Sequence, residues 1–476
     1  MVSTKEILSL LPLMITAGGA VLLLLLIGIK RNHIITRFAS LFTLLAAFIS
    51  LFVVRPYQPV YVEHLLVIDS FGSLYMGIIF LASFFIILIS HQYLESTTSD
   101  IEEYYILILL ATLGSATLAV SHHFITFFLG IEILSSSLYV LIAFLRYREH
   151  SLEAGIKYLI LAAVSSAFLL FGMALVYASY GTMYFPELAA FLKQGNIPAL
   201  AAGGFGLIVV GIGFKLALVP FHLWTPDVYE GAPAPVTALV ATVSKGGVFA
   251  LWLRFILDLD AFRFPALMTV LGILAAVSML TGNLLALLQQ NVKRILAYSS
   301  IAHMGYLLVA FLTGSNLATD SSTFYLVAYI ITSLGAFGVV TVISGTDHDA
   351  TSMGEYKGLF ARKPWLAGVF TIMLLSLAGI PFTAGFFGKF YVLMAGVEAN
   401  LWWLVIILVI SSTIGLFYYL KIILTMFSNP EQQTAAHGSF SFTNTLYFGL
   451  LTIAILGLGL YPSLLIRLIH SFSMVM

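Results

Sequence analysis

The sequence predicts an all-α membrane protein with about fourteen spanning helices. Three observations support this fold: the composition, the lengths of the apolar runs, and two prolines inside such runs. Of the 476 residues, 61% are hydrophobic and only 9% are charged, whereas a soluble domain carries about 25% charged residues. The mean hydropathy is +1.05. Apolar residues are spread along the whole chain, which excludes a soluble domain with one anchor.

The formal net charge is +0 and the chain has no cysteine. A neutral chain offers no basic surface for nucleic acid. Without cysteine there are no disulfides and none of the thiolates that iron–sulfur clusters normally need. His122 and His123 are adjacent and do not share a helix face, so we expect them at the interface and not on a metal. The chain is therefore expected to bind no cofactor and no metal.

The spans follow one another with short connections. A spanning helix needs about 20 mainly apolar residues. The first run, 7–29, is long enough to span and no A-x-A-like cleavage site follows it, so we expect it to remain as a helix. The expected spans begin near Ile7, Ile34, Phe71, Tyr104, Phe124, Lys157, Gly204, Ala234, Phe264, Arg294, Ser322, Trp365, Leu401 and Phe442.

Lysine and arginine in the loops indicate the orientation, because cytoplasmic loops carry an excess of them. One set of alternating loops is richer in these residues: it holds Lys30, Arg31, Arg146, Arg148, Lys293, Arg294, Lys357, Arg362 and Lys363. The opposite set holds mainly Lys5, Arg55, Lys193, Arg263 and Arg467. The richer set should be cytoplasmic, which places both termini on the other side and requires an even number of spans.

Two spans contain a proline, Pro220 in the seventh and Pro381 in the twelfth. Proline removes a helical hydrogen bond and clashes with the preceding turn, so both helices should be broken. The breaks lie five helices apart, and a second unit of five helices enters the membrane upside down. Broken helices at matching positions of inverted repeats are typical of transporters. We therefore expect helices 1–3 in residues 1–103, inverted repeats of helices 4–8 in 104–257 and helices 9–13 in 258–427, and helix 14 in 428–476.

Several charged residues fall inside the predicted spans. Glu132 lies in the fifth, Lys215 in the seventh, Lys245 in the eighth and Lys389 in the twelfth, just after the break. Each costs about 2.5–3.5 kcal/mol at a helix centre on insertion scales, which favours a function. The alternatives are a lysine that snorkels to the interface and, for Glu132, a structural salt bridge.

A buried lysine suits proton transfer. Burial disfavours its charged form and a nearby carboxylate favours it, so a Glu132–Lys215 pair could switch the lysine between holding and releasing a proton. His222 and His303 could join such a path, or could only hydrogen-bond between helices. Further relay candidates are Lys157 and Lys421, the latter near the end of the thirteenth span. By contrast, we expect two arginines near span ends, Arg37 and Arg254, to be interfacial anchors.

Four segments resemble a known family: SLEAGIKYLILAAVSSAFLLFGMALVY, GFKLALVPFHLWTPDVYEGAPAPVTALVATVSK, NVKRILAYSSIAHMGYLLVA and LSLAGIPFTAGFFGKFYVL. They are similar to the antiporter-like membrane subunits of bacterial respiratory complex I, the proton-pumping NADH:quinone oxidoreductase. The resemblance runs essentially end to end, and TPDVYEGAPAPVT looks like the subunit N branch rather than the L and M branches.

The resemblance implies fourteen helices with inverted five-helix repeats. It implies a coupling pair at Glu132 and Lys215, a central lysine at Lys245 and a lysine near the exit at Lys389. It also implies that NADH, FMN, the iron–sulfur clusters and quinone are bound by partner subunits. The expected neighbours are subunits M, K and J together with membrane lipids, in the bacterial inner membrane with periplasmic termini.

The sequence thus predicts a proton-translocating subunit of NADH:quinone oxidoreductase. The runner-up is a subunit of a multi-component sodium/proton antiporter or of a membrane-bound hydrogenase, which the wider family also resembles. A third reading is a structural membrane module that only spaces other subunits.

Overall fold

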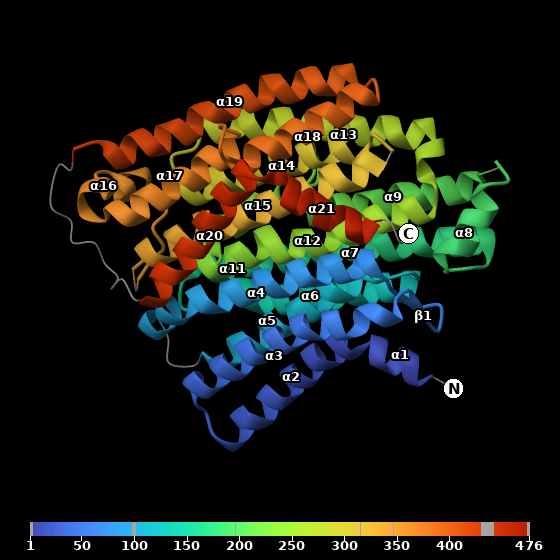
Figure 1. Ribbon diagram of the computed structural model, residues 1–476, viewed down its shortest axis with the longest axis horizontal. Coiled ribbons are helices and arrows are strands. Elements are labelled where there is room, and N and C mark those ends of the chain that lie inside the picture. The colour runs from blue at the N-terminus through green and yellow to red at the C-terminus, as the bar shows by residue number, and fades with distance from the viewer. Residues whose placement is uncertain are drawn as a thin grey trace.

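The computed structural model describes residues 3–97, 101–195, 197–314, 316–345, 347–429 and 442–473. These residues form a bundle of long helices (Figure 1) and one short antiparallel hairpin, which the sequence analysis did not predict. The first elements are α1 Thr4–Ser9, α2 Leu11–Ile29, α3 His33–Val54, β1 Val60–Val62, β2 Leu66–Ile68 and α4 Ser70–Thr97.

Two groups of helices follow, at the positions of the two predicted five-helix repeats. The first contains α5 Glu102–Ala119, α6 Phe124–Ile142, α7 Glu149–Tyr180, α8 Phe185–Leu192, α9 Ala199–Leu216, α10 Trp224–Gly231, α11 Ala234–Leu239, the π-helical turn η2 Val240–Ser244, and α12 Lys245–Asp258. The second contains α13 Pro265–Leu287, α14 Val292–Phe311, α15 Asn316–Ile343, α16 Leu359–Arg362, α17 Pro364–Ala378, α18 Ala384–Glu398 and α19 Trp402–Phe427.

The packing also agrees with two related units. In each, the first two long helices pack on each other, α5 on α6 and α13 on α14. In each, the third is followed by a helix that is broken, α9–α10 and α17–α18. The breaks at Pro220 and Pro381 are thereby confirmed, and the domain boundaries at residues 103, 257 and 427 stay a prediction.

Twelve helices of the described residues are long and apolar enough to span a membrane. Two more predicted spans fall short of that measure: α5, which begins with two glutamates, and the broken pair α17–α18. Together these account for the predicted fourteen. The predicted start of the sixth span at Lys157 was late, because α7 begins at Glu149.

The last predicted helix is in fact two helices, α20 Phe442–Leu460 and α21 Pro462–Ser473. Pro462 begins α21, as expected for a residue that cannot continue the preceding helix. Both α1 and the far end of α21 lie toward the same end of the bundle (Figure 1), in agreement with an even number of spans.

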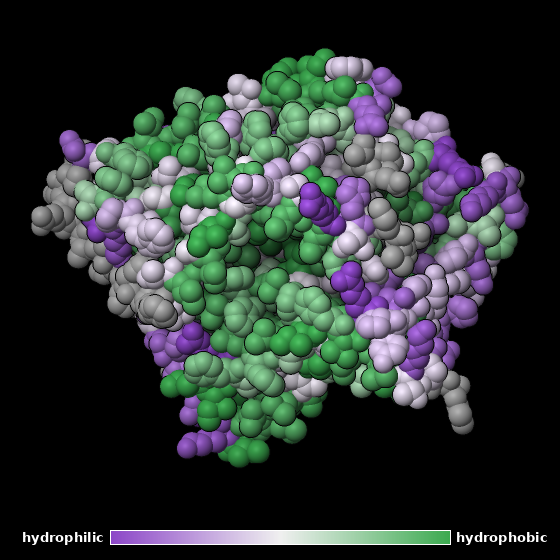
Figure 2. Space-filling view, viewed as in Figure 1, coloured by the Kyte–Doolittle hydropathy of each residue, from purple (hydrophilic) through white to green (hydrophobic). Residues whose placement is uncertain are grey.

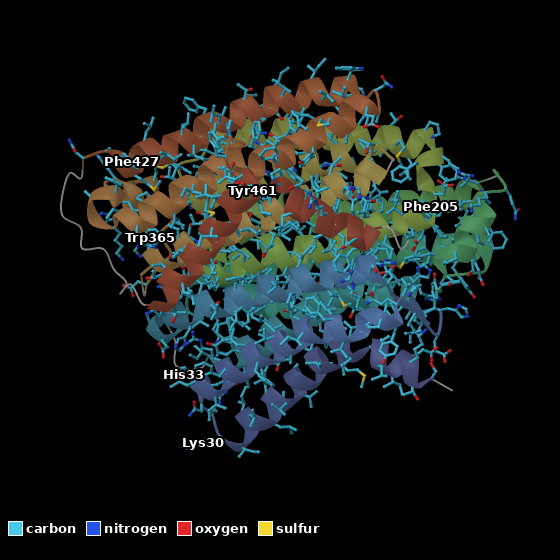
Figure 3. All side chains as sticks on the ribbon, in the orientation of Figure 1. Lys30, His33, Phe205, Trp365, Phe427 and Tyr461 are labelled. Carbon is cyan, nitrogen blue, oxygen red and sulfur yellow. The ribbon has the colours of Figure 1, made fainter. Side chains whose placement is uncertain are left out.

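The bundle has a buried centre and an apolar outside. Its centre is the segment Ala234–Asp258, which is almost entirely buried, together with α14 and α15, whereas α2 is the least buried of the twelve apolar helices. Figure 2 shows hydrophobic side chains over the middle of one face and hydrophilic side chains mainly at its two ends. Figure 3 places Lys30 and His33 at the same end as Trp365 and Phe427, with Phe205 toward the other end.

Candidate functional site

The break in the first unit sets the position of Lys215. Helix α9 ends at Ala217, which adopts a left-handed conformation with φ 61°. The indole Nε1 of Trp224, at the start of α10, donates to the carbonyl of Phe214 at 2.9 Å. Lys215 therefore lies in the last turn of α9, where a cation is favoured by the free carbonyl groups.

Lys215 is bonded to a serine and not to Glu132. Its Nζ donates to Ser135 Oγ at 2.6 Å and lies 5.5 Å from the ring centre of Tyr158. Glu132 accepts a hydrogen bond from Ser166 Oγ at 2.6 Å. Because residues three apart are neighbours on a helix surface, Ser135 lies beside Glu132 on α6. The two charges thus share a site, but no direct ion pair joins these two described side chains.

Lys245 begins α12 directly after the π-helical turn η2 and is 0% exposed. Its Nζ donates to Ser300 Oγ at 2.5 Å and lies 5.7 Å from the ring centre of Tyr229. The Ser300 hydroxyl is also hydrogen-bonded to Tyr329 OH at 2.5 Å. Short π-helical turns occur frequently at functional sites. One hydroxyl therefore connects the central lysine to α15.

His303 lies one turn along α14 from Ser300 and joins three helices. Its Nδ1 is 2.6 Å from Tyr325 OH on α15, and its Nε2 is 3.1 Å from Tyr419 OH on α19. Either ring nitrogen can be the donor, since the roles depend on the tautomer. The prediction of an interior histidine beside the buried lysines agrees with this position.

Lys389 lies on α18 just after the second break. Its Nζ donates to the carbonyl of Ala378, at the end of α17, and to Ser412 Oγ on α19, both at 2.8 Å. It also lies 5.3 Å from the ring centre of Tyr306. The last residue of α17 therefore supplies a carbonyl that holds the lysine.

A cavity of about 10 Å³ is lined by His303, Tyr329 and Lys389. This volume corresponds to about one water molecule. Thr332 and Ser376 also border the cavity and are hydrogen-bonded to each other at 3.1 Å. Polar side chains therefore lead from Lys245 to Lys389 through the centre of the bundle with only this small gap.

The remaining relay candidates lie apart from this chain. His222 lies in the first break, and its buried Nδ1 has no hydrogen-bond partner among the described residues. Lys157 is exposed and pairs with Glu153 at 2.7 Å and with Asp227 at 3.0 Å. Lys421 on α19 is only partly buried. No observation tests these three as relays, so their roles stay predictions.

The adjacent histidines at the start of α6 have separate partners. His122 Nδ1 lies 3.0 Å from Asp258 Oδ2. His123 Nδ1 accepts from the backbone N–H of Ile125 at 3.1 Å and so caps α6. The two imidazole rings therefore have different partners, as expected for adjacent residues that do not share a helix face.

The expectation that Arg254 is an interfacial anchor was wrong. Its side chain is 4% exposed and forms a two-point ion pair with Asp69, with nitrogen–oxygen distances of 2.8 and 2.7 Å. Its Nε donates to the carbonyl of Ala119 at 3.1 Å. Asp69 is 185 residues away in sequence, so no local pattern indicates the pair.

A second buried ion cluster was also missed. Lys293, which the sequence analysis placed in a loop, is 0% exposed, and its Nζ donates to Asp349 Oδ2 at 2.7 Å. Arg148 and Tyr93 bind the other oxygen of Asp349 at 3.0 and 2.6 Å. The one local signal for this ion cluster was an aspartate in a loop near the loop cations. The burial of Asp349 depends on packing between distant segments, which the sequence does not show.

The fold and this site define a class: a many-spanning helical membrane protein with broken helices and a buried chain of lysines, as in ion-translocating proteins. The family model described as NADH:quinone oxidoreductase/Mrp antiporter, TM, matches residues 121–415. The chain belongs to this family.

The relatives extend over nearly the whole chain. NADH-quinone oxidoreductase subunit N of Ectopseudomonas mendocina (strain ymp) is 46% identical over 99% of this chain and 98% of its own length. A chain of respiratory complex I from Thermus thermophilus with bound aureothin is 32% identical, with a TM-score of 0.83 over 96% of this chain and 98% of that one.

A more distant structure shares only the fold. A chain of the Mrp complex from Dietzia sp. DQ12-45-1b has a TM-score of 0.84 at 20% identity, covering 97% of this chain and 96% of that one. The subunit N relative, 46% identical over 99% of this chain, confirms the resemblance to the subunit N branch that was stated from sequence.

Proposed function

We propose that this chain translocates protons as a membrane-arm subunit of NADH:quinone oxidoreductase, coupled to electron transfer on other subunits. One observation carries the proposal: the buried polar chain from Lys245 through Ser300 and Tyr329 toward Lys389. A charged group at membrane depth is costly and needs a reason. Three buried lysines, each held by neutral groups, are well suited to gain and lose protons.

The hydrogen bonds suggest how a proton moves along this chain. The Lys245 ammonium donates to Ser300, whose hydroxyl can donate and accept and so connects to Tyr329. A water in the small cavity would connect this group with His303 to Lys389. Lys389, which is bonded to Ser412, is the last acceptor in the chain: its neutral amine takes up the proton and becomes an ammonium.

Glu132 and Lys215 form the proposed switch upstream of this chain. Their partners, Ser166 and Ser135, hold them apart in the present arrangement. If the carboxylate moves to the ammonium, it stabilises the proton on Lys215; if it leaves, burial favours release. His222, Lys157 and Lys421 remain candidates for proton delivery at either end.

Moving a charge outward against the membrane potential costs about 2.3 kcal/mol per 100 mV. A pump must therefore be coupled to a downhill reaction, which we infer takes place on other subunits of a larger complex. We infer that NADH, FMN, iron–sulfur clusters and quinone are held by partner subunits, and that subunits M, K and J are neighbours. The loop charges support an orientation with both termini periplasmic, and we infer that the membrane is the bacterial inner membrane.

The test is Lys245→Ala in the assembled complex. We expect a lower proton-to-electron ratio and slower coupled NADH:quinone activity, because the central carrier is removed. Proton uptake by vesicles measured together with NADH oxidation gives both quantities. Ser300→Ala keeps the lysine but removes its hydroxyl link and should lower the same ratio.

Lys193→Ala is the control, since Lys193 is an exposed lysine at the end of α8. It should leave pumping unchanged. A normal proton-to-electron ratio in both Lys245→Ala and Ser300→Ala would contradict the proposed path.

A further inference from the structure

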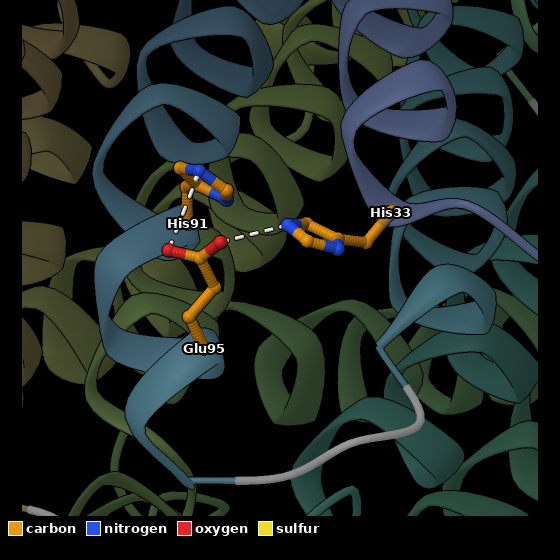
Figure 4. A group of neighbouring side chains, drawn as sticks. All are labelled: His33, His91 and Glu95. Carbon is orange, nitrogen blue, oxygen red and sulfur yellow. Dashed lines mark hydrogen bonds and ion pairs between the residues drawn. The ribbon is translucent and has the colours of Figure 1, made fainter.

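Two histidines and a glutamate converge at the end of the bundle that carries Lys30 (Figure 3). His33 begins α3, and His91 and Glu95 lie one turn apart on α4 (Figure 4). His33 Nε2 is 2.7 Å from Glu95 Oε1, and His91 Nε2 is 3.5 Å from Glu95 Oε2. One ligand atom of each residue lies within 4.8 Å of the others. We propose that these three side chains bind a zinc ion, independently of the function proposed above.

The distances are close to those of a zinc site. Zinc binds histidine nitrogen at about 2.0–2.1 Å and carboxylate oxygen at about 2.0–2.2 Å, in tetrahedral geometry. Such ligands lie about 3.4 Å apart. The atoms here therefore need movements of about 1 Å. Glu95 and His33 can make them, because their side chains are 44% and 32% exposed.

The position of His91 also favours a metal. Its side chain is only 16% exposed, so the packing around the ring holds it beside the carboxylate of Glu95. Its Nε2 faces Glu95 at 3.5 Å, too far for a good hydrogen bond. The ring lies beside that of His33, with centres 5.5 Å apart. A metal between the two rings and the carboxylate would satisfy the His91 Nε2, which the metal-free arrangement leaves poorly bonded.

The ligand types suit a first-row metal ion such as zinc better than calcium or magnesium. Two imidazoles with one carboxylate suit zinc, whereas calcium and magnesium prefer oxygen ligands. Three protein ligands leave one position for water. Bound zinc would join the start of α3 to the end of α4, which pack on each other and share the His33–Glu95 contact.

Neighbouring charges limit the affinity. Arg37 lies one turn after His33 on α3, and its charge acts on both His91 and Glu95. Arg31 nearby is paired with Glu103 on α5 and so adds little net charge. A zinc ion bound by only one carboxylate keeps a net positive charge, and the positive charge of Arg37 repels it. Removing this arginine should therefore tighten zinc binding.

The experiment measures zinc bound per complex, and Co²⁺ absorption in the visible range, on the purified complex after chelator treatment and titration. We expect His91→Gln and Glu95→Gln either to lose one bound zinc ion per complex or to bind that ion at least about tenfold more weakly. Arg37→Gln should tighten the same equivalent several-fold. The Co²⁺ spectrum of the wild type should show four-coordinate absorption that is absent from both ligand variants.

His348→Gln is the matched control. His348 also faces a glutamate, with Nε2 3.1 Å from Glu355 Oε1, but lacks a third ligand in the described residues. It should leave the titration unchanged. Equal zinc stoichiometry and affinity in the wild type, His91→Gln and Glu95→Gln would overturn the site, and so would an unchanged affinity in Arg37→Gln. Neither outcome bears on proton translocation.

Discussion

Buried cations in this protein have two kinds of partner. Lys215, Lys245 and Lys389 are bonded to hydroxyl or carbonyl oxygens, whereas Lys293 and Arg254 are bonded to aspartates. An ammonium held by neutral groups can release its proton without leaving an unpaired carboxylate behind. An ion pair loses its compensation when one partner is neutralised. The first group is therefore suited to proton transfer and the second to holding helices together.

The Asp69–Arg254 pair gives a prediction at this scale. Asp69→Asn leaves the buried guanidinium without a counter-charge, and breaking such a pair costs about 3–5 kcal/mol. We expect a clearly lower midpoint of thermal unfolding for the purified protein, and less protein in the membrane. The control is Glu398→Gln at an exposed position. An unchanged midpoint in Asp69→Asn would show that the pair does not stabilise the fold.

The sequence identified part of the site. Membrane depth and the proline breaks were enough to select Lys215, Lys245 and Lys389, because a charge in an apolar run is a local signal. The hydroxyl partners were missed, since serine and tyrosine are common inside these helices. The Glu132–Lys215 pair proposed from sequence is open here, and each side chain is bonded to a serine. These serine contacts depend on side-chain geometry that spacing does not give.

At the scale of elements, the helix breaks position the charged side chains. Gly379 ends α17 with φ 83°, and a Cβ added there would lie 2.8 Å from Cδ of Lys389. The end of α17 and the stem of the lysine therefore pack with no room for a side chain. The proline predicted the break, but the glycine gives the backbone its shape.

Gly379→Ala should damage both backbone and site. A left-handed conformation costs an alanine about 1–2 kcal/mol, and the added methyl group displaces Lys389. We expect lower thermal stability and a lower proton-to-electron ratio. Gly368→Ala, in the same helix with open space around it, should keep the ratio and lose no stability, because alanine favours a helix. Equal ratios in the two variants would contradict this role for the break.

At the scale of the whole molecule, one ion cluster joins distant parts of the chain. Asp349, after α15, is bound by Lys293 of α14, by Arg148 before α7 and by Tyr93 of α4. Burial raises the pKa of the Asp349 carboxyl. The neighbouring Lys293 ammonium, with hydrogen bonds from Lys293 and Tyr93, outweighs this effect and holds the pKa below its usual value. The cluster thus connects the two units at one end of the bundle.

This lowered pKa predicts how stability depends on pH. The cluster stabilises the fold fully above the unfolded-state value of about 4, and this stabilisation is lost as pH falls through the lower folded-state value. Asp349→Asn should lower the midpoint of thermal unfolding near neutral pH. On acidification, the midpoint of this variant should fall less than that of the wild type. Thermal unfolding at a series of pH values measures both effects.

Asp347→Asn provides a control in the same loop, because Asp347 is exposed. It should follow the wild-type pH curve. If Asp349→Asn also follows the wild-type pH curve, the charge of Asp349 does not contribute to the stability of the fold.

The overall architecture was largely predictable. Apolar runs predict the number of spans, and the lysines and arginines of the loops predict on which side of the membrane each loop lies. Both are local properties of the chain. The hairpin β1–β2, the separate α21 and the buried cluster around Asp349 depend on contacts between residues far apart. The same dependence explains why Lys293 looked like a loop residue.

The π-helical turn at Val240–Ser244 has a consequence for the angle of Lys245. Each residue of an α-helix turns the chain by about 100° around the helix axis. The extra residue of a π-helical turn therefore changes the direction of every later side chain relative to those of α11. A helical wheel drawn through the whole span would therefore aim Lys245 at the wrong neighbours. Its direction toward Ser300 is set by the extra residue, and shortening this turn by one residue would rotate the lysine away while leaving the composition almost unchanged.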